Sequence, residues 1–127
     1  MHMGIPSLKA LLGLGVSVTL LGGCDATQPM EIPAANVSAE QFAPYSCNQL
    51  SAEYRRAQGI AQQMESELKR RADQDEALTS VWAVTGIQLG GLKYGDGPMT
   101  QEYAELKGTM AALETAMISK DCNNLPF

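Results

Sequence analysis

Histidine is nearly absent from this sequence: the only one among its 127 residues is His2. Imidazole is the base of Ser-His-Asp and Cys-His nucleophile systems and a common ligand of zinc. His2 lies upstream of a candidate cleavage site before Cys24, so a processed chain could build none of these sites. The remaining acids are scattered among Lys, Arg and Gln, as on solvated helical faces. We therefore predict no catalytic residue, no metal site and no enzyme activity.

The sequence also lacks an excess of basic over acidic residues and any long apolar run. Nine Lys and Arg against fourteen Asp and Glu give a net charge of −5, which provides no electrostatic footprint for nucleic acid or for anionic headgroups. The uncharged stretch 10–21 has twelve residues, whereas a helix needs about 20 to cross a bilayer. We expect no nucleic-acid partner.

The N-terminus instead has the form of an export signal. Lys9 and the α-amino group make a short positive region, and residues 10–21 have the length of a signal-peptide apolar core. The following Leu21-Gly22-Gly23-Cys24 resembles the lipobox of bacterial lipoproteins, in which the cysteine thiol accepts a diacylglyceryl group. We predict a signal peptide over 1–23 and lipidation of Cys24 by diacylglycerol and an acyl chain, with no other cofactor.

This signal also predicts a location. The resemblance implies a bacterial cell-envelope protein that is held on a membrane by its lipid and faces the periplasm. An aspartate directly after the lipidated cysteine, here Asp25, resembles the inner-membrane retention signal of enteric bacteria. The inner membrane is therefore favoured, and the outer membrane stays open.

Removal of residues 1–23 leaves 104 residues, enough for one small domain, and changes the net charge from −5 to −6. With Cys24 assigned to lipid, Cys47 and Cys122 remain as an even pair in an oxidising compartment. We predict that they form a disulfide that closes a loop of about 75 residues and stabilises the domain by about 4 kcal/mol.

Residues 24–45 contain Pro29, Pro33 and Pro44 among small and polar residues, with no apolar period. This composition predicts an extended, flexible tether between the lipid and a domain over 46–127.

Two helical seams are visible in that domain. Apolar residues recur at steps of three and four over 50–68 and again over 103–117, the second helix being capped by Thr100. Asp73 or Asp75 could cap a shorter helix through Leu89, and the Gly-rich turn at 95–97 follows. We predict an all-α fold: a disulfide-stapled antiparallel helical hairpin of coiled-coil type with a shorter third helix. The first seam consists of Leu50, Tyr54, Ala57, Ala61, Met64 and Leu68, and the second of Tyr103, Leu106, Met110, Leu113 and Met117.

The cysteine pair sets the register of this hairpin. Leu50 should face Met117 and Ile118, while Met64 and Leu68 approach Tyr103. Gly108 should mark a close contact with Gly59 at the matching height of the first helix.

Short motifs join these elements: Cys47-Asn48-Gln49-Leu50, acids at 73–75, an uncharged segment at 81–92, Gly95-Asp96-Gly97, Glu102-Tyr103-Ala104-Glu105-Leu106-Lys107-Gly108 and Lys120-Asp121-Cys122. The stretch 47–122 resembles a group of small, functionally uncharacterised bacterial lipoproteins with a Cys-x-x-Leu … Gly-Asp-Gly … Leu-Lys-Gly … Lys-x-Cys helical domain. The resemblance implies this architecture and supplies no reaction or ligand.

Residues 81–92 contain the only tryptophan and no charge. Gly86-x-x-x-Gly90 permits a close helix approach, so this segment is either a contact surface for a partner helix or the membrane interface, or else a core helix anchored by Trp82. Gly95-Asp96-Gly97 is a turn and not a calcium loop, because the twelfth position holds Lys107 instead of glutamate. The candidate contact residues are Val81, Trp82, Val84, Ile87, Leu89 and Leu92.

We therefore expect a non-enzymatic envelope lipoprotein with a protein partner, acting as an interaction or structural component of an envelope complex. A small inhibitor or exclusion factor is the first alternative. A carrier of an apolar ligand is the second, although so small a domain could hardly enclose the several hundred Å³ of an ordinary ligand pocket.

Overall fold

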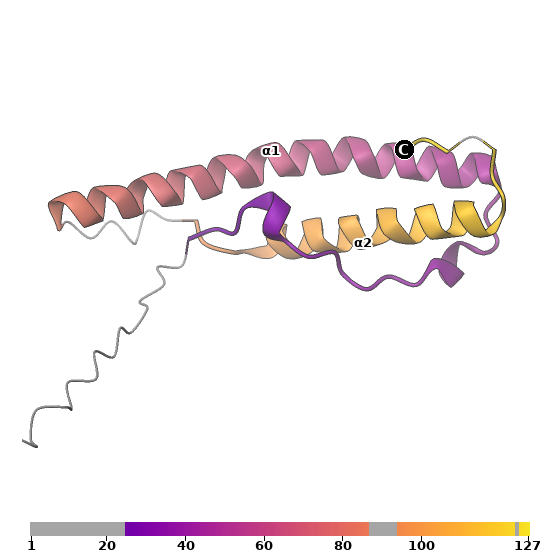
Figure 1. Cartoon of the computed structure of the whole chain (residues 1–127), viewed down its shortest axis with the longest axis horizontal. Helices are drawn as coiled ribbons and strands as arrows, with labels where there is room; N and C mark the ends of the chain where they lie inside the picture. Colours follow the sequence, from indigo (N-terminus) through magenta and orange to yellow (C-terminus); the bar gives the residue numbers. More distant parts are fainter. Residues whose placement is uncertain (1–24, 87–93, 124) are drawn as a thin grey trace, which may run out of the picture.

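The protein folds as an all-α hairpin, as predicted. The computed structural model describes residues 25–86, 94–123 and 125–127. Two long helices, α1 (Cys47–Thr85) and α2 (Pro98–Ser119), run antiparallel and side by side (Figure 1). Two short 3-10 turns, η1 (Pro29–Glu31) and η2 (Ala39–Phe42), precede them. None of the helices in the described ranges is long and apolar enough to cross a membrane.

Helix α1 begins at a complete capping box. The Ser46 hydroxyl accepts a hydrogen bond from the Gln49 amide at 3.3 Å, and the Ser46 amide donates to Gln49 Oε1 at 2.8 Å, so two amides at the helix start are satisfied. The helix is 39 residues long, ends at Thr85 and has Gly86 as its C-cap. Gly86 adopts φ +72° and donates its N–H to the Trp82 carbonyl at 2.8 Å, a left-handed cap that favours glycine.

Helix α2 begins three residues earlier than predicted. Its N-cap is Gly97 and Pro98 is its first residue, whereas the sequence pattern favoured a cap at Thr100. Proline suits the first helical position because its φ angle is already helical and its missing N–H would have no partner there.

The predicted disulfide joins the two helices. Cys47 and Cys122 are bonded, with Cα atoms 5.6 Å apart. The core beside the disulfide places Leu50 in one buried cluster with Met117, as the register predicted. Ile118 does not join it, since 59% of its surface is exposed; Met117, one residue earlier, points inward instead.

A second cluster confirms the other half of the register. Leu68 and Tyr103 are both buried and pack together, with Met64 against them. They share this cluster with Ala61 and with Ile32, a residue from the segment before the helices. The N-terminal segment therefore contributes to the core.

The predicted third helix does not form as a separate element in the described residues. Residues 73–85 belong to α1, which passes through Asp73 and Asp75 without a break. Asp75 caps no helix, because its carboxylate is buried and accepts hydrogen bonds from other segments.

The segment expected to be a flexible tether is extended, but it lies along the hairpin (Figure 1). Ile32 is only 2% exposed. The Ala35 amide donates to the Ala104 carbonyl at 2.8 Å, and Lys107 Nζ donates to the Ile32 carbonyl at 2.6 Å. Proline excludes regular helix here, but it leaves the remaining backbone groups and apolar side chains available to α2.

Gly108 explains how this segment approaches so closely. The expected Gly59–Gly108 contact is wrong, since a Cβ on Gly59 would meet nothing within 4 Å. A Cβ on Gly108 would instead overlap the carbonyl oxygen of Ala35 and lie 2.9 Å from Val37 Cγ2. The missing side chain makes room for the N-terminal segment and not for α1.

Candidate functional site

The last turns of α1 carry the candidate contact residues that can be placed. Val81 and Trp82 are each 43% exposed and Val84 is 86% exposed. This part of the segment is therefore a continuation of α1 with an exposed apolar surface, and not a third helix folded onto the core. We call these three residues the apolar end. Cys24, Ile87, Leu89 and Leu92 lie outside the described residues.

The apolar end is exposed because α1 is longer than its partner. Leu68 packs beside Tyr103, and α2 begins only five residues before Tyr103. In an antiparallel pair, α2 therefore reaches α1 only to about Asp73. At 1.5 Å per residue, the remaining residues of α1 make roughly 15–20 Å of helix. Figure 1 shows that this end of α1 extends past the start of α2.

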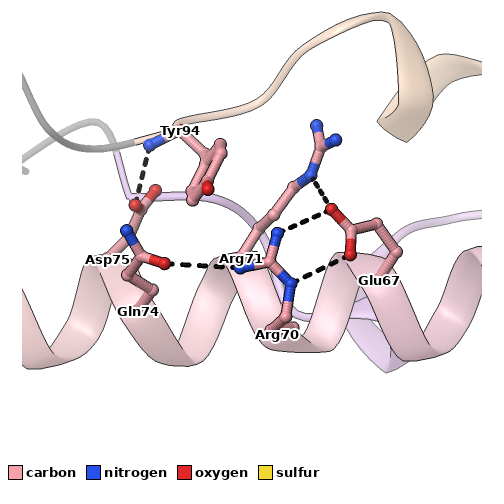
Figure 2. A network of polar contacts seen from close by, with 6 residues as sticks. All are labelled: Glu67, Arg70, Arg71, Gln74, Asp75 and Tyr94. Carbon is pink, nitrogen blue, oxygen red and sulfur yellow. Dashed lines mark hydrogen bonds and ion pairs between the residues drawn. The ribbon is translucent and has the colours of Figure 1, made fainter.

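Asp75 organises the junction at which this extension begins. Its side chain is 0% exposed. Oδ1 accepts the N–H of Tyr94 at 2.7 Å, and Oδ2 accepts the N–H groups of Ala26 and Gly95 at 2.9 and 2.7 Å (Figure 2 shows the Tyr94 bond). Three backbone donors satisfy the buried carboxylate, which would otherwise be very unfavourable inside the fold. One side chain thus joins α1 to the N-terminal segment and to the turn before α2.

Further hydrogen bonds hold the same N-terminal residues. Thr79 Oγ1 lies 3.0 and 3.1 Å from the two carboxylate oxygens of Asp25. The amide and hydroxyl of Thr27 each donate to Asp96 at 2.7 Å. The chain is therefore attached to the hairpin from its first described residue.

A hydrogen bond between Gln28 and Asp73 extends this junction along α1. Gln28 Nε2 donates to Asp73 Oδ1 at 3.2 Å, and Lys69 Nζ forms an ion pair with Asp73 at 2.8 Å. The hydrogen bond from Lys69, followed by that from Gln28, lowers the pKa of Asp73.

A charged cluster flanks the junction on the side of the disulfide. Glu67 accepts hydrogen bonds from Arg70 at 2.8 and 2.9 Å and from Arg71 at 2.8 Å (Figure 2). The Arg70 bonds, followed by the Arg71 bond, lower the pKa of Glu67 to about 2, and Glu67 in turn raises the pKa of Arg70. The two guanidinium carbons lie 5.4 and 5.1 Å from the centre of the Tyr94 ring. These cation–π contacts hold the turn onto α1.

Sequence reasoning missed the role of Asp75. Its position continues the apolar spacing of the first seam, where an aspartate is a poor core residue, and we interpreted it as a possible helix cap. An acid at a core position of a helix was the available signal, because a buried carboxylate needs several donors nearby.

The polar groups around the junction have hydrogen-bond partners within the fold. No buried side-chain nitrogen or oxygen atom in the described part lacks a hydrogen-bond partner. Across residues 25–86, 94–123 and 125–127, no three side chains among His, Cys, Asp and Glu are placed to hold a metal ion. Comparison with protein-family models, curated proteins and solved structures gives no match to this chain.

Proposed function

We propose that this chain is a lipid-anchored, non-enzymatic interaction or structural component of a bacterial cell envelope, and that the apolar end is its contact surface. The observation that carries the proposal is the exposure of Val81, Trp82 and Val84 on a helix extension that α2 does not cover. Adjacent exposed apolar side chains at the end of a rigid element are typical of a surface that binds something.

The rigidity of the hairpin supports the same role. The disulfide closes the far end, and Asp75 ties three segments together at the near end. A hairpin held at both ends gives the helix extension that carries the apolar end a fixed base, which limits the conformational entropy lost on binding.

The test has two parts. The intact mass of protein extracted from its own membranes should correspond to a chain that starts at Cys24 with added acyl mass. A photo-cross-linking amino acid at Val84 should then give a cross-linked product in those membranes, and the same amino acid at Ile118, which is 59% exposed at the disulfide end, should give much less. An unlipidated chain, or equal cross-linking from both positions, would overturn the proposal.

A further inference from the structure

We infer that the occupant of the apolar end is the lipid surface itself, so that the lipid on Cys24 and the side chains of Val81, Trp82 and Val84 form one membrane contact. This inference rests on the proposed lipidation of Cys24. It names the partner of the apolar end, which the proposed function leaves open.

The first step is the attachment point. Asp25 is hydrogen-bonded by Thr79, and the Ala26 amide is bound by the buried carboxylate of Asp75. A trans peptide bond holds consecutive Cα atoms about 3.8 Å apart. A lipid on Cys24 therefore starts one residue away from a fixed point on α1, with no free tether in between.

The second step is where that fixed point lies. Thr79 precedes Val81 by two residues and Val84 by five, which is at most about 8 Å along the helix axis. The acyl chains and the apolar end therefore emerge from the same end of the hairpin. The disulfide end lies at the opposite end of the molecule (Figure 1), since Cys47 is 32 residues, or roughly 48 Å of helix, away from Thr79.

The third step is charge. No residue from 77 to 86 is charged, so this part of α1 can enter the headgroup region without desolvating an ionised side chain of its own. Tryptophan is enriched at that depth because its ring is apolar and its N–H is polar. The nearest charged side chain of α1 is Glu76, five residues before Val81, and the other charged side chains of α1, such as Lys69 and Glu67, lie farther towards the disulfide.

A protein helix would also fit three apolar side chains. The lipid surface is favoured because the covalent anchor brings it to the site in every molecule, at very high effective concentration.

Trp82 provides the measurement, because it is the only tryptophan in the chain. Lipidated full-length mature protein is placed in vesicles of phosphatidylethanolamine and phosphatidylglycerol, with and without bromine on the acyl chains. We expect brominated lipid to remove most of the Trp82 emission, and we expect emission at shorter wavelength than in the detergent-free unlipidated protein. The matched control combines Trp82→Phe with Ile118→Trp, which moves the single tryptophan to another exposed position at the disulfide end; its emission should be nearly unaffected by bromine.

The outcomes separate the two proposals. If the mass confirms the lipid and Trp82 is not quenched, the inference is overturned while the anchor stands, and a protein partner becomes the occupant. Equal quenching in the control variant would mean that the hairpin lies flat on the bilayer, which also overturns it. If the purified chain carries no lipid, the proposed function fails and this inference fails with it.

Discussion

Two glycines, Gly108 and Gly59, provide a matched test of how the N-terminal segment is packed. Both lie inside helices, so replacing either with alanine gains about 1 kcal/mol of helix propensity. Their surroundings differ: a Cβ at Gly59 meets nothing within 4 Å, whereas a Cβ at Gly108 overlaps the Ala35 carbonyl. We therefore expect the two substitutions to change stability in opposite directions.

The magnitude for Gly108→Ala follows from the contacts that hold Ala35. To relieve the overlap, the segment must move away from α2. It then loses the hydrogen bonds from Ala35 to Ala104 and from Lys107 to Ile32, at about 1 kcal/mol each, and part of the Ile32 burial, at about 1 kcal/mol more. After the propensity gain, the free energy of unfolding should fall by about 2 kcal/mol. For a domain of this size the midpoint of thermal unfolding should fall by roughly 8–16 °C.

Thermal unfolding followed by circular dichroism measures both variants. Gly59→Ala should unfold at a higher temperature than the parent protein, by roughly 4–8 °C. Hydrogen exchange adds a local readout, because the Ala35 amide should lose protection in Gly108→Ala alone. If Gly108→Ala proves as stable as the parent while Gly59→Ala is stabilised, the N-terminal segment is not packed on α2.

Three further changes test the junction, the charged cluster and the disulfide. Asp75→Asn leaves at least one buried N–H donor without an acceptor and weakens the remaining hydrogen bonds, so urea denaturation should show a free energy of unfolding lower by about 3 kcal/mol. The exposed control Asp73→Asn should lower it by less than about 1 kcal/mol. Similar losses in the two variants would contradict the role of the junction. Glu67 has a folded-state pKa of about 2 against an ordinary 4.5, so its stabilising effect is present above about 4.5 and is lost as pH falls towards 2. At low salt, Glu67→Gln should lower the unfolding temperature at neutral pH and not near pH 2, and a difference independent of pH would refute this. Replacing Cys47 and Cys122 with alanine opens a loop with a sequence separation of 75 and should destabilise by about 4 kcal/mol; a loss below about 1 kcal/mol would show that the unfolded chain is not constrained by this bond.

Local patterns predicted much of the hairpin correctly. Apolar residues spaced three and four apart bury one face of a helix whatever its partner is, so the two seams were recognisable without a structure. The cysteine pair then left one antiparallel arrangement, and it placed Leu50 beside Met117 and Leu68 beside Tyr103. The prediction that Ile118 also faces Leu50 was wrong. Side chains of adjacent helical residues point about 100° apart, so only one of Met117 and Ile118 could face the core.

The hydrogen bonds of Asp75 could not be predicted from local sequence patterns, for a physical reason. An aspartate in a helical sequence can cap a new helix, face water or accept donors from distant segments, and the three options look alike in one dimension. The donors that decided the outcome for Asp75 lie 19, 20 and 49 residues away in the chain. Because these donors are backbone amides, which nearly every residue possesses, no pattern of side chains in the sequence could predict them.

The sequence by itself determined the helical class, the two seams and the disulfide pairing, since each depends on spacing along the chain or on the identity of two residues. Tertiary structure alone decided that α1 continues past Asp75, that the proline-containing segment lies on α2 and that Gly108 receives it. Those outcomes depend on which backbone groups meet across the fold. They also decide the path of the first described residues, because the hydrogen bonds from Thr79 to Asp25 and from Ala26 to Asp75 hold this part of the chain beside the start of the exposed helix extension.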